Sequence, residues 1–235
     1  MSRDSDCQST ELGALLHLAS PVLPIGGFSY SQALEAAIHH GLITDAADAH
    51  QWIEGHLFEV MTKSEALIWI YLYNAWQAED VEKISYWNDW FWASRETSEF
   101  RLETEQMGWS LVKLIKELAW GTPDQHAVLI AMQTITLPCA HTFACHTNGI
   151  QVHNGLHIYL YTWLENQVMA AMKGVPLGQV AGQKILLSIG RALASRMNDI
   201  LTHACAEGTL VNTFAPQLNI LSSRHEHQYS RLFRS

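Results

Sequence analysis

Four side chains that can bind a soft metal ion stand close together in the second half of the chain. They are Cys139, His141, Cys145 and His146. Thiolate and imidazole are suitable ligands for zinc or nickel, and on a helix His141 and Cys145 would share one face. The spacing matches no established zinc pattern, however, and no second pair of ligands follows at a supporting distance. We therefore interpret the four as core cysteines and polar histidines. A functional site for a soft metal ion at these side chains remains the alternative.

Two further histidine pairs have suggestive spacing. His39 and His40 are adjacent, and His153 and His157 are four residues apart, which is one helical turn. Neither pair has a carboxylate close in sequence that would orient a ring for catalysis or metal binding. We interpret both pairs as surface or capping histidines.

A charged segment, residues 94–105 (SRETSEFRLETE), carries carboxylates and arginines at helical spacing. Arg95 and Glu99 are four residues apart, as are Arg101 and Glu105, so each pair can meet on one helix face. We expect a solvated, ion-paired face. A docking strip for another protein is the second interpretation. General acid–base catalysis is disfavoured, because nothing near these carboxylates resembles a nucleophile or a metal site.

The motifs of common enzymes and nucleotide-binding proteins are missing from the sequence. It contains no GxxxxGK[ST] loop, no GxGxxG between a strand and a helix, and no GxSxG, HExxH or CxxC. We therefore predict that the chain is not an enzyme and has no catalytic, cofactor-binding or metal-binding residues. A helical enzyme is a distant third hypothesis, which a bound cofactor would revive.

The composition restricts the expected partners and compartment. The 235 residues carry a formal net charge of −9, so no nucleic-acid partner is expected, because phosphate backbones require a basic patch. No apolar run approaches the length of a membrane span. The N-terminus, MSRDSDCQST, does not resemble a secretory signal. The four cysteines, Cys7 among them, are too scattered for a disulfide framework. We expect a cytoplasmic protein.

Apolar residues recur at helical spacing along most of the chain. We predict one all-α globular domain of roughly eight to ten helices over residues 1–207, packed like other non-bundle helical folds. The last long helix should extend from about Pro176, in its first turn, to about Ala206. Ser64–Ala78 is apolar around most of its circumference, so a helix there should be buried on several sides.

The C-terminal residues 208–235 differ from the rest of the chain. They show no helical periodicity, contain Pro216 and end in SSRHEHQYSRLFRS. Arginine and tyrosine, both present here, are enriched among the anchors of protein interfaces. We expect an irregular tail that is mobile in the isolated protein and becomes ordered when it docks on a partner. The alternative is that the tail packs on its own domain.

Four segments together resemble the UreF family of urease accessory proteins. They are LASPVLPIGGFSYSQALE (residues 18–35), SRETSEFR (94–101), VPLGQVAGQ (175–183) and SRHEHQYSRLFRS (223–235). We refer to these as the four signature segments. Their order and spacing extend over almost the whole chain. Residues 128–157 match the family pattern weakly, and nothing is carried over to them.

The resemblance implies an all-α homodimer that acts as a scaffold or chaperone in urease maturation. Proteins of the UreF family bind the accessory protein called UreD or UreH, and on that platform they recruit the GTPase UreG. The assembly delivers nickel to apo-urease. The alternative is a protein that handles nickel directly, with its Cys and His side chains as the ligands. UreF is not itself a GTPase; it is discussed as a modulator of the GTPase and as part of a passage for nickel.

The signature segments also supply the candidate partner-binding residues. The glycine pair in the first segment would let its proline-rich loop turn and present Phe28 and Tyr30. Gln179, Gly182 and Gln183 would share one helix face, although close helix packing inside the domain is an equally good role for Gly182. The full candidate set is Phe28, Tyr30, Glu35, Arg95, Glu99, Arg101, Gln179, Gly182, Gln183, Arg224, His225, Tyr229 and Arg231.

Overall fold

The computed structural model describes residues 2–235, with side chains from Thr10 onward. Within this range the chain forms eleven α-helices and no β-strand, which confirms the predicted all-α class. The α-helices are α1 (Ser2–Leu18), α2 (Leu34–His39), α3 (Ala46–Gly55), α4 (Glu65–Gln77), α5 (Val81–Ser94), α6 (Ser98–Glu117), α7 (Pro123–Ala131), α8 (Leu137–Thr147), α9 (Val152–Gly174), α10 (Gln179–Cys205) and α11 (Pro216–His225). Short turns of 3-10 and π-helix join some of them.

Short acidic side chains cap the start of two of these helices. The carboxylate of Asp45 accepts hydrogen bonds from the backbone N–H groups of Ala47 and Asp48 at the start of α3. Asp80 accepts one from the N–H of Lys83 at the start of α5. Such caps satisfy amide groups that have no acceptor inside the helix, and each stabilises the protein by about 1 kcal/mol.

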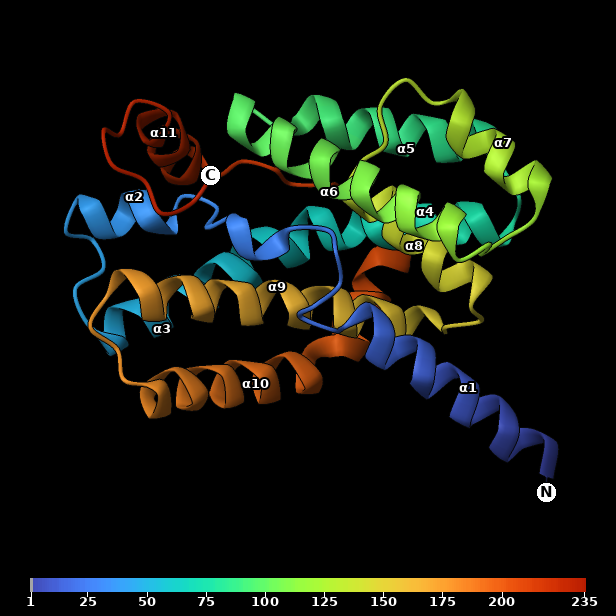
Figure 1. Cartoon of the computed structure of the whole chain (residues 1–235), viewed down its shortest axis with the longest axis horizontal. Coiled ribbons are helices and arrows are strands. Elements are labelled where there is room, and N and C mark those ends of the chain that lie inside the picture. The colour runs from blue at the N-terminus through green and yellow to red at the C-terminus, as the bar shows by residue number, and fades with distance from the viewer. Residues whose placement is uncertain (1) are drawn as a thin grey trace.

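Helix α4 lies inside the molecule and packs against α5, α8 and α9 (Figure 1). Ten of its 13 residues are buried, so the predicted burial on several sides is confirmed. Helices α9 and α10 lie side by side, and α6 packs on α8. This core holds α2 and the first turn of α6 in fixed positions on one flank of the molecule, where the C-terminal segment joins them.

Part of the C-terminal segment is helical, and the segment packs on its own domain, so the expectation of a wholly irregular tail without such contacts is wrong. Helix α11 lies against α2 and α6 (Figure 1). Its buried residues, Leu218, Leu221, Ser222 and His225, recur at helical spacing. Two of these four are polar, so the buried face has no continuous apolar stripe that would reveal the helix in the sequence.

An additional helix and one helix boundary also differ from the sequence prediction. Helix α7 is not expected from the sequence, yet Thr122 starts it with a capping box, in which its side chain and that of Gln125 each bond the other's backbone N–H. Helix α10 begins at Gln179, so Pro176 precedes the helix and does not lie in its first turn. Among the helices of residues 2–235, none combines the length and the apolar character needed to cross a bilayer.

Candidate interaction site around His225

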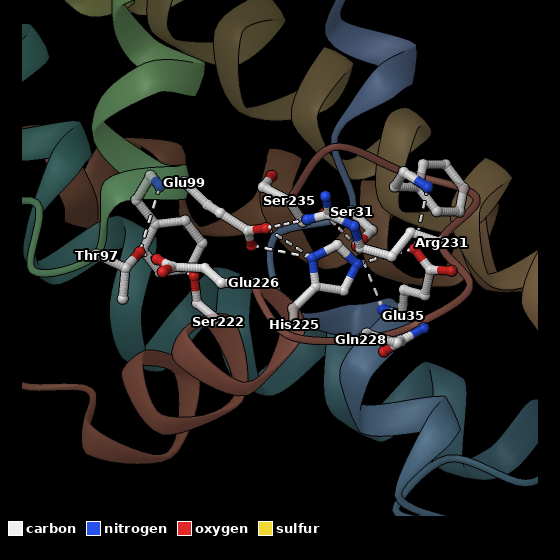
Figure 2. Close-up of polar contacts among 12 residues, drawn as sticks. Ser31, Glu35, Thr97, Glu99, Ser222, His225, Glu226, Gln228, Arg231 and Ser235 are labelled. Atoms are coloured by element: carbon white, nitrogen blue, oxygen red, sulfur yellow. Dashed lines mark hydrogen bonds and ion pairs between the residues drawn. The ribbon is translucent and has the colours of Figure 1, made fainter.

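His225, at the end of α11, is the centre of a buried polar network (Figure 2). Its ring is completely buried between two carboxylates from different helices. The Nδ1 atom lies 2.9 Å from Glu99 Oε2 on α6, and the Nε2 atom lies 3.0 Å from Glu35 Oε2 on α2. The network therefore joins the first, second and fourth signature segments, which lie far apart in the sequence.

The same two carboxylates bind the residues that follow α11. Glu35 accepts hydrogen bonds from the backbone N–H groups of Leu232 at 2.7 Å and Phe233 at 3.0 Å. Arg231 Nη1 donates to Glu99 Oε1 at 2.8 Å. Each buried carboxylate thus has several donors, which is the condition under which burial of a charge is tolerated.

The geometry favours one protonation state of His225. Both ring nitrogens face carboxylate oxygens, and an ionised carboxylate can only accept hydrogen bonds. When both carboxylates are ionised, both nitrogens donate, and this arrangement favours an imidazolium ring. Burial lowers the pKa of His225, but the hydrogen bonds and charges of Glu99 and Glu35 outweigh burial and raise the pKa above its ordinary value of 6.5.

Uncharged contacts hold the segment on both sides of His225 (Figure 2). The hydroxyls of Thr97, which caps α6, and Ser222 lie 2.8 Å apart. Ser31 donates to the carbonyl oxygen of Ser235 from its backbone N–H at 2.7 Å and from its hydroxyl at 2.5 Å. The Ser235 hydroxyl donates to Glu103 Oε2 at 2.8 Å. The end of the segment is thereby tied to the first signature segment and to α6.

The turn that presents Ser31 and Glu35 has an unusual backbone. Gln32 and Ala33 both have positive φ angles, of 47° and 67°. This left-handed conformation costs a non-glycine residue about 1–2 kcal/mol, so surrounding contacts must hold it. The Gln32 side chain supplies two: its amide donates to Glu103 at 2.6 Å, and its carbonyl accepts from the Trp163 indole at 2.6 Å.

The ion pairs predicted within residues 94–105 do not form, so the expected solvated face is wrong. Glu99 and Glu103 are buried. Arg95 lies 3.5 Å from Glu65 on α4 and does not pair with Glu99. Arg101 donates from Nε to the carbonyl oxygen of Arg95 at 2.7 Å and does not pair with Glu105. The partner of Arg95 comes from α4, and the partners of Glu99 come from α11 and from the residues that follow it.

The other candidates differ in exposure. Phe28 is exposed, as expected, but Tyr30 is buried and donates to Gln106 at 2.6 Å, so the loop does not present it. On α10, Gln179 and Gln183 are exposed. Gly182 is buried, and a Cβ there would lie 2.3 Å from the sulfur of Met172 on α9. Its role is therefore close helix packing inside the domain.

The segment that the network fixes also presents side chains to the solvent. Tyr229 is fully exposed, Leu232 is 69% exposed, and Arg224 is exposed as well. Phe233, the next apolar residue, is buried, with the ammonium group of Lys173 5.3 Å from its ring centre. The sequence indicated an adhesive surface here, but not the buried carboxylates that hold it in place.

The Cys139–His146 cluster has a different character. His141 Nδ1 accepts from the Trp69 indole at 3.2 Å and lies 3.5 Å from the Cys145 sulfur. Burial lowers the pKa of His141 to about 3 and raises the pKa of the Cys139 thiol to about 12. Burial also raises the pKa of Cys145. The ring is neutral and the thiols are protonated, which disfavours metal binding because thiolates are the ligands.

Other possible ligands do not assemble around these residues. Among the side chains described, from Thr10 onward, no three His, Cys, Asp or Glu residues are arranged to hold one metal ion. Cys139, Cys145 and Cys205 are free thiols. The side chain of Cys7 lies outside the described residues.

A cleft with a volume of about 130 Å³ lies beside the network and is lined by parts of the first and second signature segments. Phe28 and Arg95 contribute to its walls, together with Glu65, Glu103 and Tyr159. Burial is the main cause that raises the pKa of Glu103 to about 7. Glu65 accepts a hydrogen bond from the Tyr159 hydroxyl, and burial raises its pKa as well. No local sequence pattern predicts that Glu65 and Glu103 are buried.

Comparison with known protein families gives a match over most of the chain. The model of the UreF family matches residues 43–190. This chain belongs to the UreF family. The match confirms the resemblance inferred from the signature segments, and the contacts of His225 connect residues on both sides of the matched range.

Individual UreF proteins align with almost the full length of the chain. "Urease accessory protein UreF" of Cupriavidus metallidurans is 53% identical over 225 residues, which are 96% of this chain and 98% of that protein. The UreF of Cupriavidus necator is 51% identical over 228 residues, or 97% and 99% of the two chains. "Bifunctional urease accessory protein UreEF" of Bordetella bronchiseptica is 52% identical over 225 residues, which are 96% of this chain and 52% of that longer protein.

Proposed function

We propose that this chain is a urease accessory protein that works as a non-catalytic scaffold. It binds UreD/UreH, recruits the GTPase UreG, and supports nickel insertion into apo-urease as a homodimer. The names of the UreF relatives support the role in urease maturation. The relative named UreEF joins a UreF-like part to a second accessory function in one chain, which is consistent with work in an assembly.

The observation that carries the proposal is the construction of the C-terminal segment. Residues 216–235 are held on α2 and α6 through buried contacts to Glu35 and Glu99, yet Tyr229 and Leu232 remain exposed. Aromatic and apolar side chains on a fixed backbone lose little conformational entropy on binding, so they make efficient interface anchors. We assign the surface formed by Tyr229 and Leu232 to the UreD/UreH partner.

Roles within the candidate set follow from exposure. Arg224 and Tyr229 can contact a partner directly, since they are exposed. Arg231 is exposed as well, but it also pairs with the buried Glu99 and so belongs to the positioning residues. Glu35, Glu99 and His225 are buried and position the segment. We therefore separate docking residues from positioning residues, and only the former provide clean tests of binding.

Truncation of the segment is a poor test, because it also removes buried residues. The double variant Tyr229→Ala, Leu232→Ala changes only the exposed surface. We expect it to keep the wild-type melting temperature but to lose co-purification with UreD/UreH. Tyr86→Ala with Leu118→Ala is the matched control, because both side chains are exposed elsewhere on the molecule. Retained co-purification of the Tyr229, Leu232 variant would exclude this docking surface.

The scaffold proposal also concerns GTP. We expect the isolated chain neither to bind nor to hydrolyse it, because the sequence has none of the loops that surround phosphates. Calorimetry on protein purified from cells without UreG measures this directly. Stoichiometric heat of GTP binding would contradict a purely non-catalytic role.

We also propose that the protein acts in the cytoplasm. The scattered cysteines suit a reducing compartment, and the free thiols of Cys139, Cys145 and Cys205 agree with that environment. Cell fractionation with antibody detection tests the proposal, and recovery of the protein outside the cytoplasmic fraction would contradict it.

A further inference from the structure

The network around His225 balances two negative charges against two positive ones. Glu35 and Glu99 supply the carboxylates, and His225 and Arg231 supply the cations. Arg231 remains charged at any physiological pH, whereas a histidine changes its charge near neutrality. Among these four groups, the proton on His225 is therefore the charge that a modest change of pH can remove. Glu103, which accepts a hydrogen bond from Ser235 at the end of the segment, also titrates near neutrality, but it becomes an ionised acceptor as the pH rises.

The surroundings leave few other groups to compensate that loss. Glu35 faces the ring from α2 and Glu99 faces it from α6. On α11 itself, the adjacent Glu226 accepts a hydrogen bond from Ser98 at the start of α6, and Arg224 is exposed. On α9, the ammonium group of Lys173 lies over the ring of Phe233. Apart from Arg231, no cation in these described contacts bonds to Glu35 or Glu99.

Loss of the proton changes the contacts directly. A neutral imidazole has only one N–H donor, so one ring nitrogen would face a carboxylate with its lone pair. A buried charge without its partner is strongly destabilising. Glu35 is also the acceptor for the N–H groups of Leu232 and Phe233, so any shift of this carboxylate loosens the backbone of the segment that bears Tyr229.

We propose that His225 is a proton-controlled latch, whose imidazolium holds residues 226–235 on α2 and α6 and whose deprotonation releases them. The role of the latch in docking rests on the proposed function. When the segment is latched, Tyr229 and Leu232 are fixed in position for UreD/UreH. Release makes the segment flexible, and binding must then supply the entropy of ordering it.

The direction of the pH effect follows from the two states of the latch. In the released segment His225 titrates near its ordinary pKa of about 6.5, and in the latched segment its pKa is higher. Below about pH 6.5 the latch is fully closed. Between the two pKa values the latching equilibrium constant falls by about tenfold per pH unit. Above the higher pKa it falls no further.

The first experiment observes the proton in the isolated protein. Nitrogen NMR of histidine-labelled protein distinguishes an imidazolium, whose two ring nitrogens have similar shifts, from a neutral ring, whose two nitrogens differ widely. We expect His225 to be an imidazolium at pH 6.5 and to become neutral above it, while the Leu232 and Phe233 amide hydrogens begin to exchange faster. A neutral ring at pH 6.5, or a ring that stays charged up to pH 9, would overturn the latch.

The second experiment measures the affinity for UreD/UreH at pH 6.5 and pH 8.5, first with the wild type and then with two variants. We expect the wild-type affinity to be lower at pH 8.5 than at pH 6.5, because the raised pKa of His225 makes latching weaker as the pH rises. His225→Gln, which is neutral, should bind weakly at both values. His225→Lys, which keeps a cation between Glu35 and Glu99, should bind at both values with little pH dependence. Circular dichroism checks that both variants fold.

The two experiments separate the latch from the docking proposal. If the NMR titration occurs as expected but the Tyr229→Ala, Leu232→Ala variant still binds UreD/UreH, the latch stands and the docking surface is wrong. If that variant loses binding but the ring does not titrate, the docking surface stands and the latch is wrong. A wild-type affinity that is equal at both pH values while the ring titrates would overturn the coupling between them.

Discussion

Two buried histidines in this protein differ in charge and in their effect on their surroundings. His225 lies between Glu35 and Glu99, which raise its pKa above 6.5 despite burial. His141 lies between Trp69 and Cys145, and burial lowers its pKa to about 3. The first ring is a cation that holds a segment in place, and the second is a neutral member of the core. Burial alone therefore does not determine what a histidine does; its partners decide.

The comparison also explains why the sequence drew attention to the wrong histidine. His141 stands among Cys139, Cys145 and His146, a spacing that suggests metal binding. His225 stands in a polar terminus with no carboxylate at a useful helical spacing that would mark it as buried. Its acidic partners are 126 and 190 positions away. The short spacing of the Cys139–His146 cluster suggested a metal site, but these residues pack in the core. The charged site around His225 is formed by segments that are far apart in the sequence.

The largest expected effect comes from removing one carboxylate of the His225 network. Glu99→Ala leaves the imidazolium and Arg231 without a shared partner, and breaking a buried charge pair costs about 3–5 kcal/mol. We expect the free energy of unfolding, from urea titration at pH 6.5, to fall by this amount. Glu96→Ala, an exposed carboxylate on the same connection that accepts from Asn219, should change it by less than about 1 kcal/mol. Equal effects of the two variants would show that the buried network contributes no more to the free energy of unfolding than an exposed carboxylate does.

The second-largest expected effect is a pH dependence of stability caused by Glu103, which lies next to the network. Its pKa is raised to about 7 from an ordinary 4.5, so the folded state binds a proton more tightly than the unfolded chain. Stability is then present at low pH and is lost as pH rises from 4.5 through 7, by at most about 3 kcal/mol. The raised pKa of His225 acts in the same direction above pH 6.5.

The matched variants isolate the part that belongs to Glu103. We expect Glu103→Gln to reduce the loss of stability between pH 5 and pH 8, because the amide does not ionise. Glu117→Gln, on the exposed face of the same helix, should leave the pH dependence unchanged. Urea unfolding curves at several pH values measure both. An unchanged slope in Glu103→Gln would show that other groups cause the pH dependence.

The smallest effect is expected at the Cys139–His146 cluster, which contains the neutral His141. The neutral ring of His141 and the protonated thiols of Cys139 and Cys145 should bind nickel weakly, so Cys139→Ala and His141→Ala should not change nickel binding by the purified protein. Calorimetric titration with nickel salt, in a Cys7→Ser background, provides the measurement. A stoichiometric submicromolar site that either alanine variant abolishes would instead favour direct nickel handling.

The sequence was sufficient for those parts of the fold that depend on local patterns. Asp45 and Asp80 mark helix starts because a cap bonds amides within the next three residues. The apolar circumference of α4 predicts its burial, since an all-round apolar helix has no face for water. The family, likewise, follows from four contiguous segments whose order is visible without a structure.

The site depended on contacts that no local pattern encodes. Ser222 and His225 occupy the buried face of α11, so the helix lacks an apolar stripe and is read as an irregular tail. Glu99 and Glu103 have the spacing of a solvated helix face, and only α11 and the chain end that pack on them make them buried. The left-handed backbone of Gln32 likewise depends on Glu103 and Trp163.

The most direct test of the account is amide hydrogen exchange in the isolated protein at pH 6.5, read at the C-terminal segment. The central claim is that this segment is ordered and packed on the domain before any partner binds. The N–H groups of Leu232 and Phe233, which donate to Glu35, should exchange much more slowly than in an unfolded chain, whereas the N–H of Tyr229, for which the described contacts give no acceptor, should exchange quickly. Exchange of Leu232 and Phe233 at the rates of an unfolded chain would contradict the account.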